Sequence, residues 1–76
     1  MRRFGEKLHT LRERRGMSLR EMARALGFNS HSHITKIETG KRSPSLELAI
    51  QIADLFGVTI DQLVRDDLEL DPEEPA

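Results

Sequence analysis

Residues 18–40 read SLREMARALGFNSHSHITKIETG, and the first half of this stretch has the pattern of a short helix. Ser18 and Glu21 are spaced as a capping box, in which each side chain accepts the backbone N–H of the other residue at a helix start. The following residues place apolar side chains on one helical face and end in a glycine, which suits a left-handed helix end. They are Met22, Ala23, Leu26 and Gly27.

The second half of the stretch predicts another short helix, over about residues 30–39. Ser30 is its N-cap candidate. Ile34 and Ile37 share one face, and Gly40 marks the end. Two short helices that are joined by a tight turn and pack on one core form a helix-turn-helix. The second helix of that motif can lie in the major groove of DNA.

The flanking sequence predicts three more helices and no strand. Apolar residues at helical spacing predict a helix over residues 4–15. Ser45 is the predicted N-cap of a broadly apolar helix over residues 46–56. A second capping box, formed by Thr59 and Gln62, starts a fifth helix.

The predicted fold class is therefore all-α, a compact five-helix domain over residues 1–65. Residues 66–76 read DDLELDPEEPA. This segment is acidic and contains two prolines, and such a composition cannot bury much apolar surface. We expect it to form a flexible C-terminal tail, or a linker to a further domain.

The composition excludes several classes of protein. The chain has 76 residues, 37% of them hydrophobic, which is enough for one small domain. It has no cysteine, so disulfides and thiolate metal sites are excluded. It has neither an apolar run of about 18 residues nor a signal-peptide pattern. We expect a cytoplasmic protein without a membrane partner.

The charges are strongly segregated along the chain. Residues 1–42 carry eleven Lys or Arg and four Asp or Glu, whereas residues 43–76 carry one Arg and nine Asp or Glu. The formal net charge of −1 hides this asymmetry. A basic half of this kind indicates a nucleic-acid partner.

An ordered series of motifs resembles the lambda-repressor/Cro-like helix-turn-helix family, the XRE-type regulators. The series covers about residues 4–65, and its most specific part is Ile37-Glu38-x-Gly40-Lys41-Arg42-x-Pro44-Ser45-Leu46. The resemblance implies five helices and a transcriptional regulator, such as a repressor. It further implies sequence-specific binding to a double-stranded DNA operator, usually as a dimer.

The resemblance also assigns roles to individual residues. The candidates for contact with base edges are His31, Ser32, Thr35 and Lys36. The candidates for contact with phosphates are Ser18, Arg20, Ser30, His33, Lys41 and Arg42. Arg12 and Glu38 fall on positions that form a semi-buried ion pair behind the DNA face in some members of the family.

Two features depart from the family pattern. Leu19 stands where many members have a glutamine that contacts DNA, so that contact is lost or is replaced by Arg20. The turn between Gly27 and Ile34 is one residue longer than the commonest form. His33 could therefore take the role assigned to His31.

Other chemistries find little support in the residues. His31 and His33 are two residues apart and point to different sides of a helix, so we expect no metal site and no cofactor. No nucleophile–base pair or phosphate-binding glycine loop is present, so we do not expect an enzyme. The competing interpretation is a protein-interaction module, an antitoxin or anti-regulator, that binds its partner through the acidic half.

A dimer is expected because one recognition helix reads few base pairs. A two-fold dimer places two such helices about one turn of DNA apart, on a palindromic operator. The apolar surface available for this contact lies at the fifth helix, the turn before it and the start of the tail: Val58, Ile60, Val64 and Leu68. Ile60 and Val64 could instead belong to the core of a single chain.

Overall fold

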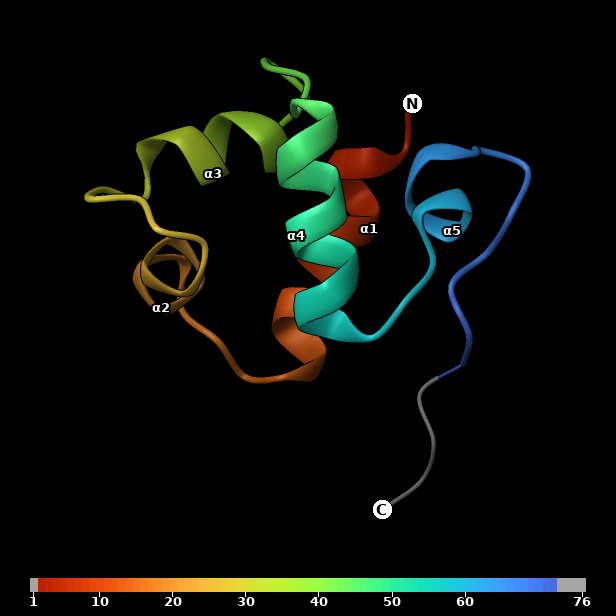
Figure 1. The fold of residues 1–76 in the computed structure, drawn as a ribbon, viewed down its shortest axis with the longest axis horizontal. Coiled ribbons are helices and arrows are strands. Elements are labelled where there is room, and N and C mark those ends of the chain that lie inside the picture. The colour runs from red at the N-terminus through yellow and green to blue at the C-terminus, as the bar shows by residue number, and fades with distance from the viewer. Residues whose placement is uncertain (1, 73–76) are drawn as a thin grey trace.

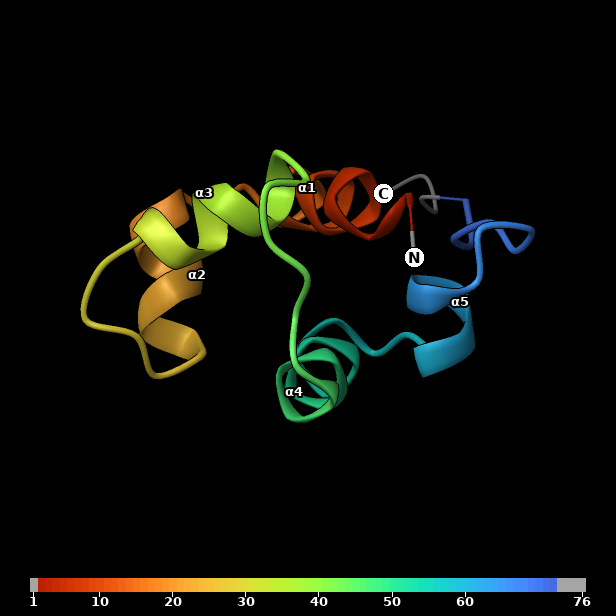
Figure 2. The same cartoon turned by 90° about the horizontal axis from the view of Figure 1, so that it is seen from above.

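The computed structural model describes residues 2–72 and contains only helices and connecting turns over that range. The five helices are α1 (Phe4–Arg14), α2 (Leu19–Ala25), α3 (Ser32–Glu38), α4 (Leu46–Phe56) and α5 (Ile60–Val64). In Figure 1, α2 and α3 form one end of the molecule, α4 crosses in front of α1, and α5 lies at the other end. The view from above places α1 and α3 in one layer with α4 beneath them (Figure 2). The predicted all-α, five-helix fold is confirmed.

Local capping signals position three of the helix starts. Glu21 N–H donates to Ser18 Oγ at 3.0 Å, and Ser18 N–H donates to Glu21 Oε1 at 3.0 Å. The Thr59–Gln62 capping box has the same two bonds, each 3.0 Å long. Ser45 Oγ accepts the N–H of Leu48 at 3.1 Å. All three predicted caps are confirmed, because each depends only on residues three positions apart.

The predicted N-cap at Ser30 is one residue too early. The N-cap of α3 is His31, whose backbone is already in the helical region at φ −83° and ψ −4°. Ser30 Oγ instead accepts the N–H of Ser32 at 3.1 Å. The serine still satisfies an N–H group of the first turn, but it does so from the position before the cap.

One apolar core joins all five helices. α1, α2 and α3 contribute the faces expected from their spacing, and α4 and α5 close the core. Its buried members are Phe4, Leu8, Leu11, Met22, Ala23, Leu26, Ile34, Ile37, Leu48, Ala49, Ile52, Ala53, Phe56 and Leu63. Two apolar residues of α4 stay outside it, since Leu46 is 72% exposed and Ile50 is 43% exposed. No helix within residues 2–72 is long and apolar enough to cross a membrane.

Lys7 is the most deeply buried charged residue in the described part of the chain, with 1% exposure. Its ammonium group donates to three backbone carbonyl oxygens: Gln62 at 2.6 Å, Arg65 at 2.8 Å and Leu68 at 2.6 Å. These carbonyls lie at and beyond the C-terminal end of α5, where a positive charge also complements the helix dipole. Lys7 thus ties α1 to α5 and to the residues that follow it.

Residues 66–71, where the sequence predicts the start of a flexible tail, make defined contacts with α1 in the structure. We call these residues the C-terminal segment. Asp66 accepts the backbone N–H groups of Arg2 at 3.1 Å and Arg3 at 2.9 Å, and so supplies the cap that the start of α1 lacks in its own sequence. Leu70 packs against the core. Residues 73–76, the last four of the predicted tail, lie outside the described residues.

Candidate nucleic-acid interface

The helix pair α2 and α3 forms the scaffold of the candidate site. Figure 1 shows α2 nearly end-on with α3 lying lengthwise beside it, so the two axes are strongly inclined to each other. Met22 and Ala23 of α2 and Ile34 and Ile37 of α3 are all buried, which fixes the two helices on one core. The opposite face of α3 is left on the surface.

The outer face of α3 carries polar side chains without a carboxylate. Ser32 and Lys36 are exposed, and Thr35 is half-buried. The Thr35 hydroxyl donates to the carbonyl oxygen of His31 at 3.1 Å, and its oxygen lies 3.3 Å from His31 Nδ1. Ser32 Oγ lies 3.0 Å from Ser30 Oγ. This face therefore offers both donors and acceptors, as base edges require.

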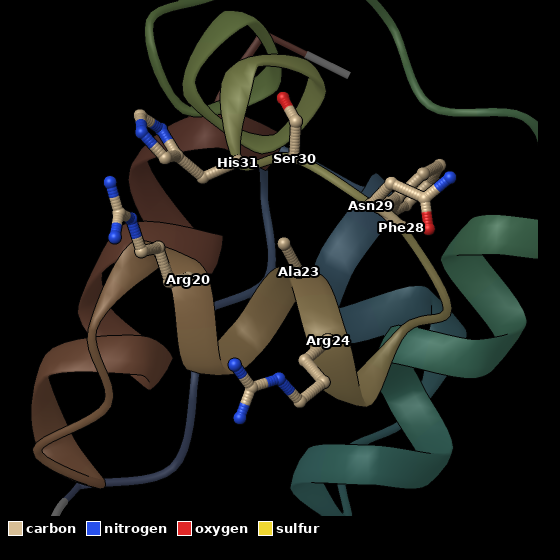
Figure 3. Close-up of a pocket in the computed structure, with 7 residues that line it drawn as sticks. All are labelled: Arg20, Ala23, Arg24, Phe28, Asn29, Ser30 and His31. Atoms are coloured by element: carbon tan, nitrogen blue, oxygen red, sulfur yellow. The ribbon is translucent and has the colours of Figure 1, made fainter.

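The two neighbouring histidines have different surroundings. The ring of His33 lies with its centroid 4.8 Å from that of Phe28, in a tilted arrangement. His31 lies at the start of α3 and its ring points toward Arg20 of α2 (Figure 3). The structure thus separates the two candidates for the first position of the recognition helix: one packs on an aromatic ring, and the other faces a cation-lined hollow.

This hollow lies between α2 and the turn that precedes α3, and has a volume of about 400 Å³. Arg20 and Arg24 line it from α2; in Figure 3 Arg20 points toward His31 at the start of α3, whereas Arg24 points away from it. The full lining is Arg20, Ala23, Arg24, Phe28, Asn29, Ser30 and His31. It contains no carboxylate and is rich in hydrogen-bond donors, so it suits an anionic group such as phosphate.

Four cationic side chains around α3 make no hydrogen bond or ion pair within residues 2–72. They are Arg20, Lys36, Lys41 and Arg42, and all four are exposed. The backbone N–H groups of Lys41 and Arg42 both bond to the carbonyl oxygen of Lys36, at 2.9 and 3.2 Å. This turn holds two cations at the C-terminal end of α3. Ser18, the remaining predicted phosphate contact, is exposed and has its hydroxyl in the capping box.

The structure brings Arg12 of α1 and Glu38 of α3 together. Arg12 Nε donates to Glu38 Oε2 at 2.8 Å, and the side chains are only 14% and 8% exposed. Arg12 also donates to the Met17 carbonyl oxygen at 2.9 Å. The hydrogen bond with Glu38 raises the pKa of Arg12 above its ordinary value. The carboxylate at the end of α3 is thus neutralised, and α3 is joined to α1.

Three residues with defined roles in the structure were not predicted, and two of them, His9 and Gly5, lie at this site. His9 Nδ1 lies 2.8 Å from Glu38 Oε1 and 3.1 Å from Arg12 Nη2, and so contacts both members of the ion pair. Gly5 of α1 packs on the last carbonyl groups of α3, where a β-carbon would lie 2.7 Å from the carbonyl oxygen of Glu38. Lys7 could have been noticed, because it falls on the same helical stripe as Phe4 and Leu11 and therefore faces the core.

The predicted dimer surface is used in part by the single chain. Val58, Ile60 and Val64 are half-buried and pack against the chain's own core, and Leu68 is half-buried beside α5. Each of these side chains keeps some exposed surface. Within residues 2–72, no three His, Asp or Glu side chains are grouped as metal ligands would be.

Comparison with known proteins adds to this geometry. Residues 3–66 match the family described as a helix-turn-helix domain. The chain is 38% identical over 78 residues to a Thermococcus kodakarensis protein named as an HTH-type transcriptional regulatory protein; the match covers 93% of this chain and 24% of the relative. It is 33% identical over 63 residues to the cryptic phage CTXphi transcriptional repressor RstR of Vibrio cholerae, covering 83% of this chain and 56% of that one.

A third relative is the HTH-type transcriptional regulator DdrOP3 of Deinococcus deserti. It is 34% identical over 60 residues, which cover 79% of this chain and 46% of the relative. The chain therefore spans between about a quarter and just over half of the length of these three relatives.

Proposed function

This chain belongs to the helix-turn-helix family of transcriptional regulators, with the XRE-type pattern, and from that premise we propose that it binds double-stranded DNA and regulates transcription. The observation that carries the proposal is the surface around α3. Four exposed cations surround it, and the one carboxylate of α3, on Glu38, is neutralised by Arg12. Such a surface can bind the negatively charged DNA backbone, because no unpaired carboxylate of α3 competes for its cations or repels the phosphates.

In the proposed complex, α3 lies in the major groove. Ser32 and Lys36, which are exposed, reach base edges, together with His31 and Thr35 at the same face. Lys36 is the best candidate for guanine, because an ammonium group can donate to both O6 and N7. The packing of His33 on Phe28 favours His31 as the first residue that faces DNA.

The phosphates on either side of the groove are held by the surrounding residues. Arg20 and Ser30 line the hollow at one end of α3, and Lys41 and Arg42 lie in the turn at its other end. Ser18 and His33 complete the proposed set of phosphate contacts. Contacts of this kind fix the register of the protein on DNA but carry no sequence information.

We further propose a DNA-binding domain over residues 1–65 that acts as a homodimer on a palindromic operator. The support is the exposed part of the apolar surface at α5 and the turn before it, formed by Val58, Ile60 and Val64 with Leu68. Sedimentation of the chain at micromolar concentration, free and with operator DNA, tests the dimer. Val64→Glu should then weaken the association of two chains, and it should leave the proposed contact between Lys36 and a base pair unchanged.

DNA binding itself is tested by selecting sites from a random duplex pool and then comparing two variants. Lys36→Ala should lose about 1–3 kcal/mol on the selected site and relax the preference at one base pair. Lys41→Ala should weaken all sequences alike and flatten the log–log salt slope by about one. Arg65→Ala, which removes an exposed cation beyond α5, is the control.

The competing function predicts a different result. If the dimeric chain binds no DNA even at about 50 mM salt, where backbone contacts are strong, the regulator proposal fails. A protein-interaction module would then be the better description.

A further inference from the structure

The cations of α1 are engaged by the C-terminal segment, unlike those around α3. Arg3 forms a bidentate pair with Glu69, at 2.7 and 2.9 Å, and also donates to the Asp66 carbonyl oxygen at 3.2 Å. Arg14 donates to the carbonyl oxygen of Asp71 at 2.8 Å. Lys7 donates to that of Leu68 at 2.6 Å. Most of the positive charge of α1 is thereby used inside the molecule.

Glu69 occupies the position on Arg3 that a phosphate group would take. A guanidinium group binds carboxylate and phosphate through the same pair of parallel N–H bonds. The Arg3 pair raises the pKa of Arg3, and it holds the pKa of Glu69 below its ordinary value. Both groups are therefore charged at neutral pH.

The position of the segment sets it apart from the proposed DNA-binding face. Figure 1 shows it in deep blue, beside α5 at the end of the molecule away from α2. A basic surface on this side of α1 would bind DNA without reading bases, because it faces away from α3. Gly5, His9 and Arg12 contact α3 from one side of α1, and Arg3, Lys7 and Arg14 lie on the opposite side. DNA bound to this surface would occupy the protein without engaging α3, and such binding would compete with the proposed binding through α3.

We propose that the C-terminal segment is an internal competitor of DNA that covers the cations of α1 and confines DNA binding to the face formed by α2 and α3. The segregation of charge along the sequence then has a physical meaning: the acidic half neutralises one part of the basic half and leaves the other part open. This inference rests on the proposed function, because the ligand that the segment excludes is DNA.

The test is the variant Glu69→Gln, which keeps the size of the side chain and removes the carboxylate of the bidentate pair, so that Arg3 keeps only Glu6, at 3.2 Å, as a charged partner. Its affinity for random-sequence duplex DNA should rise roughly five- to tenfold at about 0.1 M salt, and its log–log salt slope should steepen by about 0.9 for one more neutralised phosphate. Adding Arg3→Ala to Glu69→Gln should return both values to those of the unmodified chain. Affinity for the selected site should change less than affinity for random DNA.

Asp71→Asn is the matched control. It removes the same charge from the same segment, but the Asp71 carboxylate makes no hydrogen bond or ion pair within residues 2–72, so no cation is released. Equal gains in Glu69→Gln and Asp71→Asn would overturn the inference, because net charge alone would explain them. No gain in Glu69→Gln would overturn it as well.

The two proposals fail in distinguishable ways. If the unmodified chain binds its selected site and Glu69→Gln gains nothing on random DNA, only the inference about the segment fails. If neither protein binds any duplex DNA at low salt, the proposed function fails first.

Discussion

Gly5 of α1 lies directly on the backbone carbonyl group of Ile37, at the end of α3. A β-carbon at position 5 would collide with that oxygen and lie 2.7 Å from the carbonyl oxygen of Glu38. The backbones of the first turn of α1 and the last turn of α3 are therefore in direct contact, because Gly5 has no side chain to separate them. Together with the Arg12–Glu38 ion pair, this contact sets the position of α3 relative to the rest of the domain.

Gly5→Ala should destabilise the protein, although glycine to alanine normally favours a helix by about 1 kcal/mol. The added methyl group overpacks a backbone contact, which costs roughly 1–3 kcal/mol. Affinity for DNA should fall too, because α3 must shift. Urea unfolding and DNA titration measure the two effects. In Gly16→Ala the new methyl meets nothing within 4 Å and only the φ of +63° is strained, so DNA affinity should not change. A more stable Gly5→Ala protein would contradict the packing.

Lys7→Met should be among the most damaging single substitutions. Methionine fills a similar volume, but three carbonyl oxygens lose the Lys7 ammonium group, and that of Arg65 keeps the N–H of Leu68 as a donor at 3.2 Å. The expected loss in free energy of unfolding is roughly 3 kcal/mol, because buried acceptors without partners are costly. Lys41→Met, an exposed lysine, should stay within about 0.5 kcal/mol. Chemical denaturation compares the two, and similar values would show that the Lys7 bonds contribute little.

A double-mutant cycle should show strong coupling between Arg12 and Glu38. The variants are Arg12→Met, Glu38→Gln and their combination, and the coupling energy should be about 1–2 kcal/mol for side chains that are 14% and 8% exposed. The same cycle on Arg65 and Asp67, which are 56% and 66% exposed, should give less than about 0.5 kcal/mol. Equal coupling in the two cycles would mean that burial does not matter here.

Acid should loosen the C-terminal segment through Asp66. The backbone N–H groups of Arg3 and Arg2 lower the pKa of Asp66. A lowered pKa means that the carboxylate stabilises the fold above its ordinary pKa of about 4, and that this contribution disappears as the pH falls through the lowered value. The melting temperature should therefore drop on acidification, and it should drop less in Asp66→Asn. Thermal unfolding across pH 2–7 measures this, with Asp71→Asn as the control. If the melting temperatures of the unmodified chain and of Asp66→Asn fall in parallel with pH, Asp66 does not cause the loss of stability in acid.

The helices were predictable because their signals are local. Capping boxes join residues three positions apart, and apolar stripes repeat every turn, so Ser18, Ser45 and Thr59 could be assigned as caps from sequence. Ser30 was placed one residue early because two helical signals overlap there: a serine that accepts an N–H of the first turn, and a histidine that already has helical backbone angles.

The contacts between distant residues were less predictable. The composition of the segment after residue 65 indicated flexibility, because composition gives the number of charged residues but not the residues with which they pair. Arg3 lies 66 positions from Glu69, and no spacing rule links such a pair. The resemblance to a known family supplied Arg12 and Glu38, but it gave no hint of His9 or Gly5, because their roles depend on how closely α1 approaches α3 in this chain.

The bonds of Lys7 also bear on when the domain can form during synthesis. The bond to Leu68 spans 61 positions, so α1 leaves the ribosome long before its last partner does. Until residue 68 has emerged, the nascent chain must keep a lysine on the apolar face of its first helix without the carbonyl groups that satisfy it. The helix-turn-helix would thus be fully stabilised only after nearly the whole sequence of this domain has been translated. Folding during synthesis would therefore be late and cooperative.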